Sequence, residues 1–106
     1  MTAPTSTTII VLFNLKPGIS IAEYEKFARE HDIPAVNGLP SVVGYEILKA
    51  QAVQGGGASP YQYIEIVRVT DMKQFEENMK SPVIQELFDT FLTMVESPQS
   101  IVCQDL

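Results

Sequence analysis

Apolar and polar residues alternate along the chain with a period that changes several times. Residues 7–15, TTIIVLFNL, are β-branched and almost continuously apolar, which predicts a strand buried on both faces. Residues 41–50 and 61–69 predict two more strands, and residues 98–106 predict a short last strand. Three consecutive glycines within residues 51–60 predict a flexible connection.

Three helices are predicted between these strands. Ser20 and Glu23 have capping-box spacing, so the first helix is expected to start there. It is expected to stop before Pro34, because a residue that precedes proline is disfavoured in the α conformation. Asp71 predicts the N-cap of a second helix, and the pair Ser81-Pro82 predicts the start of a third.

The resulting order β-α-β-β-α-α-β predicts an α+β, ferredoxin-like fold with an antiparallel sheet and helices on one face. Residues 7–106 are expected to form one domain after a flexible N-terminus, residues 1–6. The first two strands are apolar on both faces, whereas helices can cover only one of them. A second copy of the sheet is the simplest cover, so we expect a homodimer in which two sheets pack face to face.

The composition of the chain argues against several classes of function. The 106 residues carry a formal net charge of −6 and no basic run, which argues against nucleic acid or an anionic membrane as partner. One cysteine and one histidine exclude an internal disulfide and a Cys/His zinc cluster, so no metal is expected. Neither a signal peptide nor a membrane span is evident, and we expect a cytoplasmic protein.

No nucleophile motif or dinucleotide fingerprint is present either. No cofactor is therefore expected, and any catalysis should be proton transfer, condensation or dehydration.

His31 is the only histidine and the first candidate for a catalytic group. Its unperturbed pKa lies near neutrality, and it is placed where the first helix is expected to give way to the sheet. It could serve as a general acid or base, or donate a hydrogen bond to a substrate. Alternatively, it caps the helix by bonding the terminal carbonyl groups.

Glu65 is the second candidate catalytic residue, since it lies within the otherwise apolar strand YIEIVRV. A carboxylate there must be paired, hydrated or raised in pKa. It could act as a base or orient His31, or it could form an ion pair with Lys49 or Arg68 at an exposed edge. Strand alternation places Glu65 with Tyr63 on one face and Arg68 on the other, which disfavours a pair within the strand.

Four further residues are candidates for substrate binding: Asn14, Tyr24, Tyr45 and Tyr63. Asn14 could bond a ligand carbonyl group, or equally the turn that follows it. The Tyr24 hydroxyl could line a pocket, although an aromatic at this helical spacing is also typical of a core. Tyr45 and Tyr63 could form walls for a flat ring, or be ordinary strand residues.

Residues 24–46, with Tyr24, His31, Ile33-Pro34, the Gly38-Leu39-Pro40 turn and Gly44-Tyr45, are similar to the EthD-like pattern of the dimeric α/β-barrel superfamily. In that pattern a histidine closes the first helix just before a proline. Here Asp32-Ile33 separates His31 from Pro34, which is one residue more than the usual His-x-Pro spacing.

The segments VLFNLKPG, DIPAVNGLPSVVGYEILKA and YIEIVRVTDMKQFEENM resemble the RedY-like proteins (the HapK/PigK group) of prodiginine biosynthesis. The resemblance covers nearly the whole chain after residue 7. It implies a pyrrole or bipyrrole intermediate as substrate, with ring formation or condensation as the reaction. Two alternatives stay open: a non-catalytic binding or auxiliary protein of the pathway, and a dimeric stress-type protein whose pocket is filled by side chains.

Overall fold

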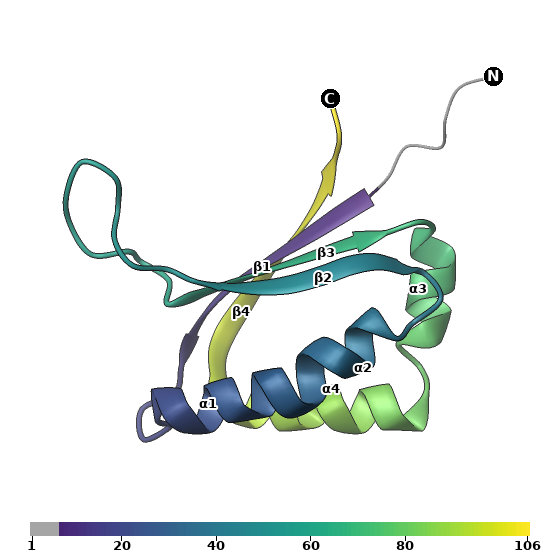
Figure 1. Ribbon diagram of the computed structural model, residues 1–106, viewed down its shortest axis with the longest axis horizontal. Coiled ribbons are helices and arrows are strands. Elements are labelled where there is room, and N and C mark those ends of the chain that lie inside the picture. The colour runs from purple at the N-terminus through teal and green to yellow at the C-terminus, as the bar shows by residue number, and fades with distance from the viewer. Residues whose placement is uncertain (1–6) are drawn as a thin grey trace.

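The computed structural model describes residues 7–106, so the expected flexible segment 1–6 lies outside the described residues. Four strands form one antiparallel sheet in the order β2-β3-β1-β4. Their bounds are β1 Thr7–Leu15, β2 Val42–Lys49, β3 Tyr63–Val69 and β4 Val95–Gln104. The helices lie together on one face of this sheet (Figure 1). The predicted α+β, ferredoxin-like arrangement is therefore confirmed.

The helical segments are α1 Ile21–Phe27, η1 Ala28–Asp32, α2 Ile33–Asn37, α3 Met72–Asn78 and α4 Pro82–Met94. The predicted caps are present at three of their starts. The Ser20 and Ser81 hydroxyl groups accept the backbone N–H three residues on, at 3.0 and 3.3 Å. Asp71 accepts the N–H of Lys73 at 3.0 Å. These side chains satisfy N–H groups that have no partner within the helix.

The expected helix end before Pro34 is wrong. The first helix continues through α1, η1 and α2 to Asn37, and η1 is a π-helical segment with i→i+5 hydrogen bonding. Pro34 lies in the first turn of α2, where its missing N–H and its fixed φ are tolerated. Gly38 then ends the helix, with its N–H on the carbonyl groups of Pro34 and Ala35.

Two apolar clusters fill the layer between helices and sheet. The first is aromatic: the Phe13 ring lies 5.6 Å from those of Tyr24 and Tyr63 and 5.1 Å from that of Phe91. The second is mainly aliphatic and lies toward the other end of the sheet, formed by Ile9, Val36, Tyr45, Val67 and Val69. Tyr24 and Phe13 have no exposed surface, so this aromatic cluster anchors α1 to the sheet.

Apolar side chains lie on both faces of β1, as predicted, whereas the helix-free face of β2 also carries Glu46. Glu65 pairs with Val11 on β1 and Ile47 on β2, so these side chains share the face toward the helices. The opposite face has no helix over it (Figure 1), and beside polar residues such as Arg68 and Gln99 it carries six aliphatic side chains. They are Ile10, Leu12, Leu48, Ile64, Ile66 and Ile101, of which Leu48 and Ile101 are 44% and 48% exposed.

The last strand differs from its prediction. It begins at Val95 rather than at residue 98, directly after α4, because β4 pairs along β1 from Leu15 back to Thr7. The connection between β2 and β3 projects from the sheet (Figure 1). Gly55, Gly56 and Gly57 there have φ of 95°, 124° and 99°, a region that favours glycine. No helix within residues 7–106 is long and apolar enough to cross a bilayer.

Candidate functional site

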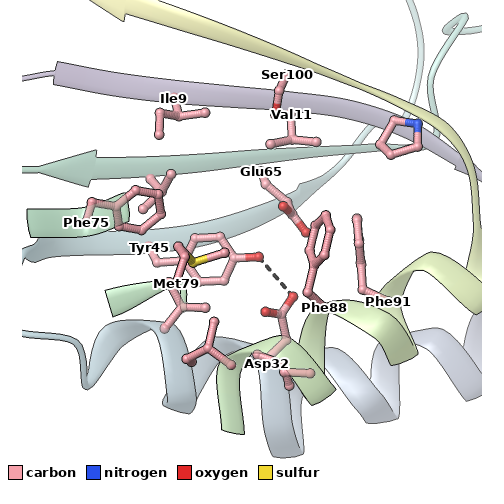
Figure 2. A pocket seen from close by; sticks show the side chains of 15 residues that line it. Ile9, Val11, Asp32, Tyr45, Glu65, Phe75, Met79, Phe88, Phe91 and Ser100 are labelled. Atoms are coloured by element: carbon pink, nitrogen blue, oxygen red, sulfur yellow. Dashed lines mark hydrogen bonds between the residues drawn. The ribbon is translucent and has the colours of Figure 1, made fainter. Parts of the chain in front are cut away.

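A cavity of about 400 Å³ lies between the sheet and the helices. Its walls come from all four strands and from η1, α2, α3 and α4 (Figure 2). Most of the lining side chains are apolar: Ile9, Val11, Val36, Val67, Phe75, Met79, Ile84, Leu87, Phe88, Phe91 and Pro98. The polar ones are Asp32, Tyr45, Glu65 and Ser100. Such a lining suits a small, largely apolar ligand held by a few polar groups.

Glu65 projects into the cavity from β3, the strand between β2 and β1 (Figure 2). The residue is 7% exposed, and its Oε2 atom has no hydrogen-bond partner. Burial raises the pKa of this carboxyl group to about 8, and the negative charge of Asp32 adds to the effect. Glu65 is therefore mainly protonated at neutral pH and able to give up a proton.

Asp32 enters the cavity from the opposite wall and is held by Tyr45. The Tyr45 hydroxyl donates a 2.9 Å hydrogen bond to Asp32 Oδ2, and both side chains are buried. Burial raises the pKa of Asp32 to about 6, while the bond from Tyr45 works against this rise. Burial and the two carboxylates raise the pKa of the Tyr45 hydroxyl far above its ordinary range, so it stays a donor.

Tyr45 is itself fixed through its backbone by Asn37. The Asn37 amide accepts the Tyr45 N–H and donates to the Tyr45 carbonyl oxygen, both at 3.0 Å. Asn37 Nδ2 also donates to the Ile33 carbonyl oxygen at 3.0 Å. The end of α2 and the start of β2 are thereby joined directly beside the Asp32–Tyr45 pair.

The two carboxyl groups differ in pKa because their surroundings differ. Burial and the charge of Asp32 both raise the pKa of Glu65, whereas burial alone raises that of Asp32, and the nearby Tyr45 hydroxyl lowers both. At neutral pH the site holds a protonated carboxyl group near an ionised one, which is a general acid and a general base in one cavity.

His31 lies outside this cavity. The residue is exposed, its ring is 6.2 Å from that of Phe27, and it lines neither this cavity nor a smaller one beside Tyr24. The π-helical segment explains its position, because i→i+5 bonding places one more residue in a turn. Asp32, rather than His31, therefore follows Ala28 on the buried side.

The π-helical segment coincides with the one residue in excess of the His-x-Pro spacing. Two residues separate His31 from Pro34, and η1 ends at the first of them, Asp32. A helix whose ends are both fixed by packing can take up an extra residue as a wide turn. The catalytic role expected of His31 stays a prediction, and it has no geometric support from the cavity.

Tyr24 and Tyr63 lie beside a second, smaller cavity of about 110 Å³. The Tyr63 hydroxyl donates to Glu25 Oε2 at 2.7 Å, and Glu25 also pairs with Lys49 at 2.9 Å and Arg29 at 3.1 Å. The bonds from Lys49 and Tyr63 lower the pKa of Glu25. The Tyr24 hydroxyl is buried without a hydrogen-bond partner, and burial raises its pKa above the ordinary range.

Asn14 lines neither cavity. Its amide donates to the Pro60 carbonyl oxygen at 3.0 Å and accepts the Gln62 N–H at 2.8 Å. Its contacts hold the end of the β2–β3 connection, which favours a structural role over ligand binding.

The structure thus brings together two of the sequence candidates, Glu65 and Tyr45, and adds Asp32 and Ser100. Asp32 was missed because α-helical periodicity points His31 inward. An acidic residue beside an Ile-Pro pair was the one available signal. Ser100 faces the helices because it pairs with Val11, a register that the sequence does not reveal. Among residues 7–106 no group of three or more His, Cys, Asp or Glu side chains is arranged to hold a metal.

This chain is similar to known proteins in both sequence and structure. The family model of the REDY-like protein HapK matches residues 7–106. No curated protein sequence matches the chain. The crystal structure of HapK from Hahella chejuensis is similar, with a TM-score of 0.74 and 25% identity over 94% of this chain and 92% of that one.

Two more distant structures share the fold. The hydroxynitrile lyase of Passiflora edulis has a TM-score of 0.81 and 13% identity, over 98% of this chain and 96% of its own. A dimeric ferredoxin-like protein of unknown function from Thermobifida fusca has a TM-score of 0.73 and 14% identity, over 99% and 95%. At these identities the likeness concerns the fold alone.

Proposed function

The chain belongs to the REDY-like HapK family, and on this premise we propose that it acts in the biosynthesis of prodiginine, a red tripyrrole pigment. Its substrate is a pyrrole or bipyrrole intermediate, and its chemistry is cofactor-independent acid/base catalysis such as ring formation or condensation. The observation that carries this proposal is the buried Glu65 carboxyl group, with its unpartnered Oε2 atom, in an aromatic-walled cavity opposite the Asp32–Tyr45 pair.

The two carboxyl groups divide the proton transfers of a condensation between them. Glu65, protonated at neutral pH, donates its proton to a departing hydroxyl group, which leaves as water when the C–O bond breaks. Asp32, ionised at neutral pH, accepts the proton released by the ring atom that forms the new bond. Tyr45 positions Asp32 for this step. The apolar walls exclude water, which strengthens these electrostatic interactions.

We also propose that the protein works as a homodimer. The helix-free face of the sheet carries aliphatic side chains on all four strands, with Ile10, Leu12, Ile64 and Ile66 together on the two central ones. Such a face is energetically costly in water, and a second copy of the same sheet fits it. The structural relative from Thermobifida fusca is described as a dimeric ferredoxin-like protein, which supports this assembly.

Binding without turnover is the second candidate function. Eleven of the fifteen side chains that line the cavity are apolar, so it can hold a reactive pyrrolic intermediate without any chemical step. In that case Glu65 and Asp32 contribute to affinity alone, and the protein assists another enzyme of the pathway.

Complementation of a producer strain lacking this gene distinguishes the two functions. We expect Glu65→Gln to abolish pigment and to leave the bipyrrole precursor unconverted, while the folded, purified variant still binds a bipyrrole. Glu76→Gln makes the same change on the exposed surface of α3 and should complement fully. Full pigment from Glu65→Gln contradicts acid/base catalysis at this residue, and His31→Ala tests the site expected from the sequence.

A further inference from the structure

The polar side chains that line the large cavity are mainly hydrogen-bond acceptors. Its four polar side chains, Asp32, Tyr45, Glu65 and Ser100, carry oxygen atoms only. None of the lining residues that the structure describes has a cationic or N–H side chain. The Tyr45 hydroxyl proton is already engaged by Asp32 at 2.9 Å. A ligand therefore meets mainly hydrogen-bond acceptors, with Ser100 and the protonated Glu65 as the only side-chain O–H donors toward it.

The strand backbone adds no donors beside Glu65. β3 is flanked by β2 and β1 and is paired with both along Tyr63–Val69. Its N–H groups are therefore committed to the sheet ladder rather than open to the cavity. An anionic group in this position would lose its hydration without gaining the donors that a bound carboxylate requires.

The unpartnered oxygen of Glu65 requires a hydrogen-bond donor from the ligand. Glu65 Oε2 is buried and has no hydrogen bond, and a buried polar atom of this kind normally has a partner. A ligand N–H supplies that partner whether the carboxyl group is neutral or ionised, since an oxygen of either form accepts. Phe88 and Phe91 line the same cavity as Glu65 (Figure 2), and their two rings are stacked at 6.1 Å. A flat ring that packs there can direct an in-plane N–H toward Glu65.

We infer that the cavity recognises a flat N–H heterocycle through a hydrogen bond to Glu65 and rejects ligands that carry a carboxylate. This inference rests on the proposed function, because it assumes that the cavity binds a small aromatic ligand. It goes further by assigning selectivity to Glu65: the same ring system is accepted or refused according to its N–H group and its charge. The net charge of −6 acts in the same direction against anions.

The test compares ligands of one shape that differ in the inferred group. Binding of 2,2′-bipyrrole and of 2,2′-bithiophene, which lacks N–H groups, is measured by calorimetry on the full chain, with NMR shifts of the cavity phenylalanines to locate the ligand. We expect bipyrrole to bind about tenfold more tightly, the ratio that one good hydrogen bond gives. The carboxamide of bipyrrole should likewise bind about tenfold more tightly than the carboxylate.

Variants assign the preference to its residue. Glu65→Leu fills the same space without an acceptor, so the ratio between bipyrrole and bithiophene should fall to about one. Glu65→Gln keeps an acceptor oxygen and should retain part of the preference, which serves as the second variant if the leucine variant does not fold. Glu76→Gln should leave the ratio unchanged.

Three results would contradict the inferred selectivity or the proposed function. Equal binding of bipyrrole and bithiophene, or a preference that survives Glu65→Leu, overturns the inference while leaving the cavity as a ligand site. A carboxylate that binds as tightly as its carboxamide overturns the charge selectivity. If none of these rings binds in the cavity, the proposed function fails together with the inference.

Discussion

The Tyr45 hydroxyl donates to Asp32 Oδ2 at 2.9 Å, across the layer that separates the sheet from the first helix. Both side chains are buried, at 9% and 6% exposure. The bond couples the position of a candidate base to β2, which contributes Tyr45 to the cavity wall, and it is the clearest target for mutation.

Tyr45→Phe should destabilise the fold. The variant leaves Asp32 buried without its donor, and a buried acceptor that loses its partner costs about 1–3 kcal/mol. The pKa of Asp32 should also rise above about 6, because the Tyr45 bond now lowers it. Urea unfolding at pH 7 measures the first effect, and NMR titration of Asp32 the second. Tyr61→Phe, a change outside the cavity, is the control. An unchanged free energy of unfolding would contradict the role given to this bond.

Glu65 should make the protein less stable as the pH rises. Its pKa is about 8 in the fold against an ordinary value of 4.5, so between these values the native state binds more protons than the unfolded state. The free energy of unfolding therefore falls by up to about 1.4 kcal/mol per pH unit and levels off above pH 8. Asp32 contributes similarly, but only up to about pH 6.

Denaturant unfolding at several pH values between 6 and 8 isolates the contribution of Glu65. In Glu65→Gln the pH-dependent loss of stability over this interval should disappear. The free energy of unfolding of the variant, relative to that of the wild type, should therefore increase as the pH rises. Parallel curves for the two proteins would show that the Glu65 carboxyl group is not raised in pKa.

The helix-free face of the sheet should be sensitive to charge. Ile64 and Ile66 lie on the central strand β3 and point away from the helices. Ile64→Glu should convert the proposed dimer into a monomer, since a carboxylate between Leu12 and Leu48 in an apolar interface has no partner. Light scattering coupled to size exclusion gives the mass. Val83→Glu, on the outer surface of α4 and 71% exposed, is the matched control. A wild-type chain that is monomeric at high concentration would refute the dimer.

Asn14 should matter for stability and not for ligand binding. Asn14→Ala removes the bonds to Pro60 and Gln62 that hold the end of the β2–β3 connection, with an expected loss of about 1–3 kcal/mol. Asn14→Asp keeps the oxygen that accepts the Gln62 N–H and should lose less. Thermal unfolding measures the stability, and calorimetry with bipyrrole measures the binding. Weaker binding by a folded Asn14→Ala variant would show that Asn14 contributes to the ligand site.

Much of the fold was predictable because local patterns and tertiary structure agree. Period-2 alternation placed Glu65 and Tyr63 on the same face of β3, although it did not show which face lines the cavity, and three caps marked helix starts correctly. The site was harder, because the face of the first helix depends on its π-helical segment. A proline that normally ends a helix was tolerated at Pro34, and the phase of the side chains shifted by one residue. Periodicity assumes a uniform helix and cannot detect such a change.

The π-helical segment also has an evolutionary meaning. In this chain the first helix supplies Asp32 to the cavity, and we expect that one residue fewer before Pro34 would turn His31 toward the cavity instead. Gaining or losing a single residue therefore exchanges one reactive group for another, while the sheet and the remaining helices keep their places. Length variation in a helix is a route to new chemistry that requires no substitution inside the pocket.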